Sequence, residues 1–164
     1  MDDALDSLAR RVGESLKAAR LTLTTAESCT GGWIAKVITD VPGSSSWFDR
    51  GFITYTNAAK TDMLGVDAAS LERHGAVSEQ TARAMAAGAL SRSSADLSVS
   101  VTGIAGPDGG SEEKPVGTVW LAWADRRGDE VKARSFLFSG DRRAVREASV
   151  KSALSGILER IEHG

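Results

Sequence analysis

The chain has 164 residues, of which 41% are hydrophobic and 26% are charged, a composition typical of one soluble globular domain. The formal net charge of −2 excludes the basic excess that proteins need to bind nucleic-acid backbones. The single cysteine excludes an intramolecular disulfide, and no apolar run is long enough to span a bilayer. We therefore expect a cytoplasmic protein that forms one domain over residues 1–164 and has neither nucleic-acid nor membrane partners.

Hydrophobic periodicity predicts ten elements along the chain. In chain order they are a helix over about 3–20, a strand over 21–27, a helix over 29–40, a strand over 50–56, a helix over 58–66, a helix capped by Ser78, strands over 95–106, 116–124 and 131–140, and a final helix capped by Asp141. Helices alternate with the early strands, and Gly128 favours a hairpin between the last two strands. This order predicts a layered α/β domain with a mixed sheet.

Three regions at predicted strand ends concentrate small polar residues. They are "ESCTGG" from Glu27 to Gly32, the segment from Pro42 to Lys60, and "TGIAGPDGG" from Thr102 to Gly110. Ligands of open α/β sheets gather where strands pass into loops and helix starts. The first and third regions fit that placement directly.

The region "ESCTGG" permits two interpretations. Gly31 and Gly32 at a helix start would let backbone N–H groups approach an anion, but they also suit a tight strand-to-helix turn. Cys29 at a helix N-terminus is expected to have a lowered pKa. It has no obvious histidine base nearby, and Cys29 with the two histidines forms no zinc spacing. We therefore expect no metal site.

The segment after Pro42 offers a different nucleophile. Ser44, Ser45 and Ser46 precede Tyr55 and Lys60, and a neutral lysine can take the proton of a serine hydroxyl. The plainer alternative is a serine-rich turn, an edge tyrosine and a solvated lysine. The residues alone leave both possibilities open.

Several long motifs, in the same order along the chain, resemble the CinA C-terminal domain family. They are "TTAESCTGGWIAKVITDVPGSS", "RGFITYTNAAKTDMLGV", "GAVSEQTA", "SVTGIAGPDGGSEEKPVGTVW" and "FSGDRRAVR". The resemblance runs from about residue 5 to residue 160. It implies a three-layer α/β/α sandwich with a mixed, mostly parallel sheet. For a stand-alone member of this family, it also implies hydrolysis of the carboxamide of nicotinamide mononucleotide to nicotinic acid mononucleotide and ammonia, a step of pyridine-nucleotide salvage.

The resemblance also implies a serine, lysine and tyrosine mechanism without a cofactor or metal. Matched by position, Ser45 is the expected nucleophile, Lys60 its base and Tyr55 the proton relay. Because Ser44 and Ser46 adjoin Ser45, the match leaves open which of the three serines is the nucleophile. The residues expected to bind the substrate are Glu27, Ser28, Thr30, Gly31, Gly32, Asn57, Thr102, Gly103, Ala105, Gly106 and Arg142. We expect a homodimer. The alternative is a non-catalytic nucleotide- or partner-binding module associated with competence or DNA damage.

Overall fold

The structure is a computed structural model that describes residues 3–163. The predicted domain bounds of 1–164 therefore include three terminal residues outside the described range. The helices are α1 (Asp3–Ala19), α2 (Trp33–Thr39), α3 (Asn57–Leu64), α4 (Ala68–His74), α5 (Glu79–Ser91) and α6 (Arg142–His163), with a short 3₁₀ helix η1 (Ser44–Ser46). The strands are β1 (Leu23–Glu27), β2 (Phe48–Ile53), β3 (Leu97–Gly103), β4 (Thr118–Asp125) and β5 (Glu130–Leu137).

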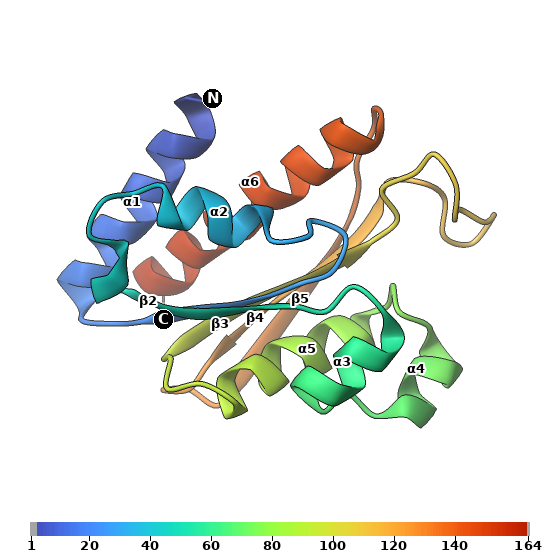
Figure 1. The fold of residues 1–164 in the computed structure, drawn as a ribbon, viewed down its shortest axis with the longest axis horizontal. Coiled ribbons are helices and arrows are strands. Elements are labelled where there is room, and N and C mark those ends of the chain that lie inside the picture. The colour runs from blue at the N-terminus through green and yellow to red at the C-terminus, as the bar shows by residue number, and fades with distance from the viewer. Residues whose placement is uncertain (1–2, 164) are drawn as a thin grey trace.

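The five strands form one mixed sheet in the order β2-β1-β3-β4-β5. β1 pairs in parallel with both β2 and β3, whereas β4 is antiparallel to β3 and to β5. β4 therefore runs opposite to the other four strands. Helices α1, α2 and α6 cover one face of the sheet, and α3, α4 and α5 cover the other (Figure 1). The expected α/β class and three-layer architecture are confirmed.

Two apolar layers hold the helices to the sheet. The predicted stripe of α1 is buried, because Leu5, Leu8, Val12 and Leu16 recur at helical spacing and face the core. Small residues bring α5 close to the opposite face, where the hydroxyl of Ser98 donates to a main-chain carbonyl of α5. This packing fixes the strand ends relative to the helices that follow them.

Three local predictions differ from the structure. The second predicted helix begins at Trp33 rather than at 29, because Gly31 and Gly32 have positive φ angles of 58° and 101° that form a turn instead. The second strand lies at Phe48–Ile53 rather than 50–56. The helix α4, which ends at His74, is not among the ten predicted elements; Asp67 caps it by accepting a hydrogen bond from the N–H of Ala69.

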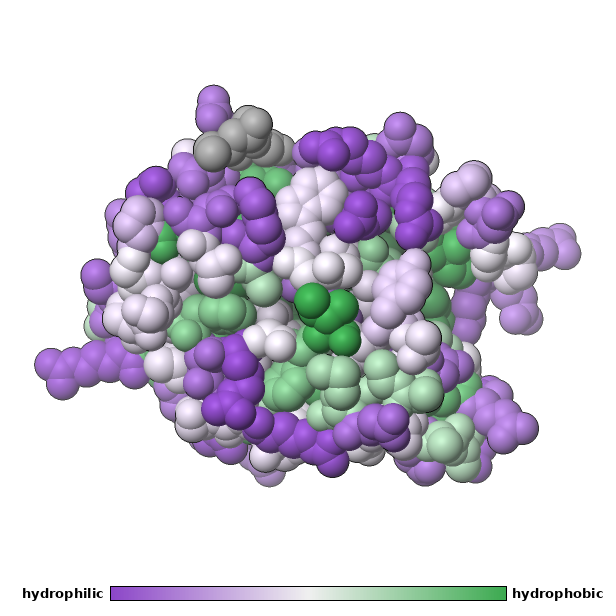
Figure 2. Space-filling view, viewed as in Figure 1, coloured by the Kyte–Doolittle hydropathy of each residue, from purple (hydrophilic) through white to green (hydrophobic). Residues whose placement is uncertain are grey.

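The surface seen in Figure 2 carries apolar side chains in the middle of the face and charged side chains around them. Exposed apolar residues lie where β2 ends and along α3, among them Ile53 and Met63. No helix within residues 3–163 has both the length and the apolarity that crossing a membrane requires.

Candidate active site

A cavity of about 300 Å³ lies where β1, β2 and β3 end. Because these three strands are parallel, their carboxyl ends meet at one edge of the sheet, and the loops that follow them converge there. The first residue of α6 reaches the same place from a distant part of the sequence. The polar and ionisable side chains that line this cavity are those of Ser28, Cys29, Tyr55, Asn57, Lys60, Thr102, Asp108 and Arg142.

Lys60 lies at the base of this cavity with only 1% of its surface exposed. Its Nζ atom is 3.1 Å from the Oγ of Ser28, 3.1 Å from the carbonyl oxygen of Thr54 and 3.3 Å from that of Tyr55. Burial lowers the pKa of this amine below the ordinary lysine value, because removal from water disfavours the charged form; nearby Cys29 opposes that shift more weakly.

The three neighbours of this nitrogen are oxygen atoms that can each accept a hydrogen bond from it, so they suit a charged amine with three N–H bonds as well as a neutral one. In the neutral form the amine donates only two of these contacts. Both carbonyl oxygens can only accept, so they take the two N–H bonds of an uncharged lysine. The remaining lone pair is then available to the hydroxyl of Ser28. The described residues provide no carboxylate partner that would hold Lys60 in its charged form. The arrangement is that of a base beside a hydroxyl nucleophile.

Local sequence explains why Lys60 points inward. Thr56 caps α3 by accepting a hydrogen bond of 3.1 Å from the N–H of Ala59. Lys60 and Leu64 are four residues apart in α3, so they share the face that packs on the sheet, and both are buried. The carboxyl end of β2 and the first turn of α3 therefore place the amine beside the carboxyl ends of the parallel strands.

Ser28 follows β1 and is fixed by backbone hydrogen bonds. Its N–H donates to the carbonyl of Val101 in β3 at 3.0 Å, and its own carbonyl accepts from the N–H of Gly31 at 3.0 Å. The side chain is 7% exposed and lines the cavity. A strand, a sharp turn and a helix thus present this hydroxyl, an arrangement that positions the nucleophile in some α/β hydrolases.

Glu27 holds that turn in place. Its carboxylate is 1% exposed and accepts from the hydroxyl of Thr30 at 2.5 Å and from the N–H groups of Ile34 and Ala35 at 2.9 and 3.0 Å. The residue at the cap position of α2, Gly32, has no side chain, so Glu27 supplies the missing acceptor from a distance. Its role is to orient the loop.

Tyr55 and Arg142 close the mouth of the cavity. The phenol of Tyr55 is largely exposed, with 59% of the residue accessible, and it accepts a hydrogen bond of 3.2 Å from Arg142. Arg142 also donates to the carbonyl of Gly106 at 2.7 Å. The guanidinium therefore ties together β2's end, the loop after β3 and the start of α6. The expected contact of the Tyr55 hydroxyl with Lys60 is not present; only its backbone carbonyl reaches the amine.

The expected pairing of Ser45 with Lys60 is not formed. Ser45 lies in η1, before the amino end of β2, and the N–H of Leu23 at the start of β1 donates to the carbonyl of Trp47. Lys60 lies beyond the carboxyl end of that six-residue strand, which spans about 20 Å at the usual rise per residue. The neighbouring Ser46 donates its hydroxyl to Gly43. The hydroxyl that Lys60 contacts belongs to Ser28, a residue predicted only to bind substrate.

The other predicted binding residues divide into two groups. Asn57, Thr102, Gly103, Ala105 and Gly106 line the cavity. By contrast, the second group faces a separate hollow of about 740 Å³ between α1, α2 and α6, and it consists of Thr30, Gly31 and Gly32. The anion site considered for Gly31 and Gly32 is therefore not in the cavity that contains Lys60.

The thiol of Cys29 behaves differently from the expectation. Burial raises the pKa of Cys29 to about 11, because the thiolate would lose its water; the nearby carboxylate of Glu27 adds to this effect. The lowering of the thiol pKa that was expected at a helix start is outweighed by burial, since Cys29 lies in the turn before α2 and is only 7% exposed. A protonated thiol is a poor nucleophile, so Ser28 is the better candidate.

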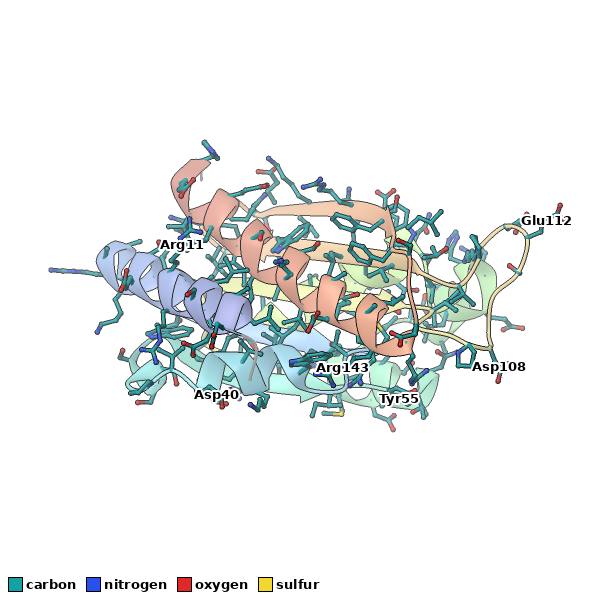
Figure 3. All side chains as sticks on the ribbon, turned by 90° about the horizontal axis from the view of Figure 1, so that it is seen from above. Arg11, Asp40, Tyr55, Asp108, Glu112 and Arg143 are labelled. Carbon is teal, nitrogen blue, oxygen red and sulfur yellow. The ribbon has the colours of Figure 1, made fainter. Side chains whose placement is uncertain are left out.

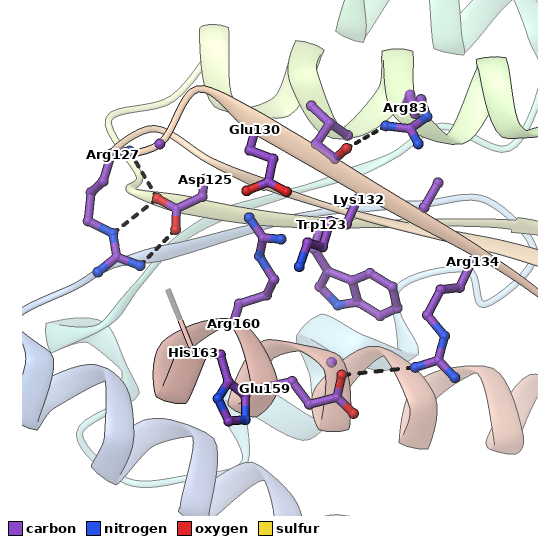
Figure 4. Close-up of a pocket in the computed structure, with 14 residues that line it drawn as sticks. Arg83, Trp123, Asp125, Arg127, Glu130, Lys132, Arg134, Glu159, Arg160 and His163 are labelled. Atoms are coloured by element: carbon purple, nitrogen blue, oxygen red, sulfur yellow. Dashed lines mark hydrogen bonds and ion pairs between the residues drawn. The ribbon is translucent and has the colours of Figure 1, made fainter.

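A larger hollow, of about 770 Å³, lies at the other end of the sheet between β4, β5 and the last turns of α6 (Figure 4). Basic side chains outnumber acidic ones in its lining, and two ion pairs form among them: Asp125 with Arg127 at 2.7 Å and Arg134 with Glu159 at 3.9 Å. The indole N–H of Trp123 donates to a main-chain carbonyl of α6. This hollow has no counterpart of the buried amine and hydroxyl. Among residues 3–163, no cluster of metal-ligating side chains occurs.

Comparison with known proteins identifies the family. The family model of the CinA C-terminal domain matches residues 5–161. The chain belongs to the CinA C-terminal domain family. The nicotinamide-nucleotide amidohydrolase PncC of Escherichia coli strain K12 is 57% identical over 158 residues, which cover 96% of this chain and 95% of that protein. The protein of the same name from Pseudomonas putida is 52% identical over 157 residues, covering 96% and 97%.

Solved structures of this family have the same fold. A competence/damage inducible protein from Agrobacterium tumefaciens superposes with a TM-score of 0.94 at 48% identity, covering 99% of this chain and 98% of that one. A CinA-superfamily protein from Escherichia coli gives 0.91 at 38% identity, covering 98% and 93%. The domain also occurs within longer chains, since a CinA-like protein of Akkermansia muciniphila is 54% identical over 153 residues that make up only 37% of its length.

Proposed function

We propose that this chain hydrolyses the carboxamide of nicotinamide mononucleotide, with Ser28 as nucleophile and Lys60 as general base. The observation that carries the proposal is the buried amine of Lys60, 3.1 Å from the Ser28 hydroxyl and without a carboxylate partner. The substrate is inferred from relatives at 52–57% identity that are named nicotinamide-nucleotide amidohydrolases. The products would be nicotinic acid mononucleotide and ammonia.

The geometry suits a two-step acyl transfer. The Oγ of Ser28 attacks the carboxamide carbon while its proton passes to the neutral Nζ of Lys60. The protonated Lys60 then gives that proton to the amide nitrogen, and ammonia leaves as the C–N bond breaks. Water attacks the resulting ester, Lys60 accepts one proton from it and returns that proton to the Oγ of Ser28 as the ester C–O bond breaks. The product leaves as a carboxylic acid, which loses its proton to solvent. One water is consumed and one ammonia is formed.

The negative oxygen of the tetrahedral intermediate requires nearby hydrogen-bond donors. The N–H of Cys29 directly follows the nucleophile, which is the position that supplies one such donor in other strand–turn–helix hydrolases. The loop after β3, from Gly103 to Gly106, lines the same cavity and is the second candidate. We assign the oxyanion to the space between these two backbone segments.

Arg142 is the proposed phosphate ligand. A guanidinium has five N–H donors, and the two hydrogen bonds to Gly106 and Tyr55 leave three for a ligand. In this scheme Tyr55 orients Arg142 through its hydroxyl and Lys60 through its backbone carbonyl, in place of the proton relay suggested by the sequence.

Ammonia release from nicotinamide mononucleotide tests the proposal. We expect Ser28→Ala and Lys60→Met each to lower kcat/KM by at least about a thousandfold, because a nucleophile and its base act as a unit. Ser45→Ala is the matched control, since its hydroxyl lies outside the cavity, and it should retain activity. Loss of turnover in Ser45→Ala with retention in Ser28→Ala would refute the assignment. Binding of the mononucleotide without ammonia release by the parent protein would support a non-catalytic module instead.

A further inference from the structure

The charge pattern at the cavity has one feature that the proposed chemistry does not use. Three charged side chains line the cavity, namely Lys60, Asp108 and Arg142. Asp108 and Arg142, one anion and one cation, are exposed residues, whereas Lys60 is buried. Asp108 is the sole carboxylate among the lining residues. It makes no side-chain hydrogen bond or ion pair with residues 3–163, so its charge is free to act on a ligand.

The backbone around Asp108 is held on several sides. At the base of its loop, the N–H of Ile104 donates to Thr118 at 2.9 Å and the N–H of Gly117 donates to Ile104 at 2.8 Å. Arg142 binds the carbonyl of Gly106, two residues before Asp108. Figure 3 shows Asp108 and Tyr55 at the same end of the molecule, with Glu112 near the tip of the projecting loop.

The outer part of the loop is also anchored. The Nζ of Lys114 donates to the carbonyl of His74 at the end of α4, at 3.0 Å. The N–H of Ser111 donates to the carbonyl of Lys114 at 2.9 Å, which closes the loop's own turn. These bonds anchor the backbone on both sides of Asp108 at the cavity, and a preorganised loop lets an exposed charge contribute to selectivity.

We propose that Asp108 is a specificity-determining residue that makes the cavity prefer a carboxamide on a positively charged, N-substituted pyridine ring over a carboxamide on a neutral ring. This inference rests on the proposed function. With the carboxamide at Ser28, the ring fills the cavity and its nitrogen and substituent face the mouth, where Asp108 and Arg142 lie. Asp108 then opposes the ring's positive charge, while Arg142 takes the phosphate. One anion and one cation match the two opposite charges of the substrate.

The test compares two ligands that differ in ring charge but share the ribose and phosphate. One is nicotinamide mononucleotide, measured by its KM, and the other is its dihydropyridine form, whose ring is neutral, measured by its inhibition constant as a competitor. The ratio of the two constants gives the preference for the cation, whether or not the dihydro form is hydrolysed. The variants are Asp108→Asn, Asp108→Glu and, as control, Glu112→Gln, an exposed carboxylate of the same loop that does not line the cavity.

We expect Asp108→Asn to raise KM for the mononucleotide about two- to fivefold, as is usual for one solvent-exposed charge pair, and to leave the inhibition constant of the dihydro form unchanged. Asp108→Glu should restore most of the preference, and Glu112→Gln should match the parent. If Asp108→Asn weakens the binding of both ligands equally, Asp108 acts on the ribose or on the loop structure, and the inference is overturned. No change in either constant would overturn it as well. Failure of the parent to release ammonia would instead count against the proposed function, so the two failures are distinguishable.

Discussion

Replacement of Glu27 should destabilise the protein and disable it together. Glu27→Ala leaves the N–H groups of Ile34 and Ala35 and the hydroxyl of Thr30 without their buried acceptor. An unsatisfied buried donor costs about 1–3 kcal/mol. If the hydroxyl finds a new partner and both N–H groups do not, we expect a loss of about 2–6 kcal/mol. That is a large part of the total stability of about 5–15 kcal/mol usual for such domains. Glu27→Gln retains one oxygen but turns an NH₂ group toward the other donor, so its cost should be about 1–3 kcal/mol.

Urea unfolding followed by tryptophan fluorescence measures these differences, because the chain has four tryptophans. The free energy of unfolding falls linearly with urea concentration, so its value in water is obtained by extrapolation. Glu72→Gln, on the outer surface of α4, is the matched control and should change stability by less than about 0.5 kcal/mol. Ammonia release should fall in Glu27→Gln even under conditions where the variant is fully folded, since the turn that carries Ser28 loses one of its restraints. Unfolding free energies of Glu27→Ala and Glu72→Gln that agree with each other would refute the capping role.

Three further predictions concern the base, the thiol and the packing beneath the site. The rate at low substrate concentration should rise with pH as Lys60 loses its proton. The midpoint of that rise should lie below pH 10.5, because burial lowers the pKa of the amine. A pH profile without this rise would exclude Lys60 as the base. Burial raises the pKa of Cys29 to about 11, so its thiol should react slowly with iodoacetamide at pH 8, as followed by mass spectrometry. The variant Cys29→Ala should still release ammonia. Rapid alkylation of Cys29 would contradict a buried, protonated thiol. Gly88→Ala should lower the free energy of unfolding in urea by about 1–3 kcal/mol, although alanine has the better helix propensity, because the new methyl group meets the backbone carbonyl of Leu64. The value of kcat should also fall, because Leu64 belongs to α3, the helix that carries Lys60. Unchanged stability would show that α3 shifts freely.

Local pattern was sufficient for most of the fold. The buried stripe of α1 is visible as Leu5, Leu8 and Val12 at helical spacing, and β3 and β4 are visible as apolar strands. These features depend on neighbours in sequence, so they can be read without coordinates. The helix α4 escaped prediction because it is only seven residues long and buries a single side chain, Leu71, which leaves almost no periodicity.

The sequence by itself determined which polar segments matter, since "ESCTGG", "ITYTNAAK" and "TGIAG" all contribute to the cavity. It did not determine which serine meets Lys60. Ser45 is closer to Lys60 along the chain than Ser28 is, but β2 separates them and carries the chain from one end of the sheet to the other. Parallel pairing of β1 with β2 brings their carboxyl ends together, so the residue after β1 and the helix after β2 become neighbours. That partnership comes from strand direction and register, which are properties of the assembled sheet alone.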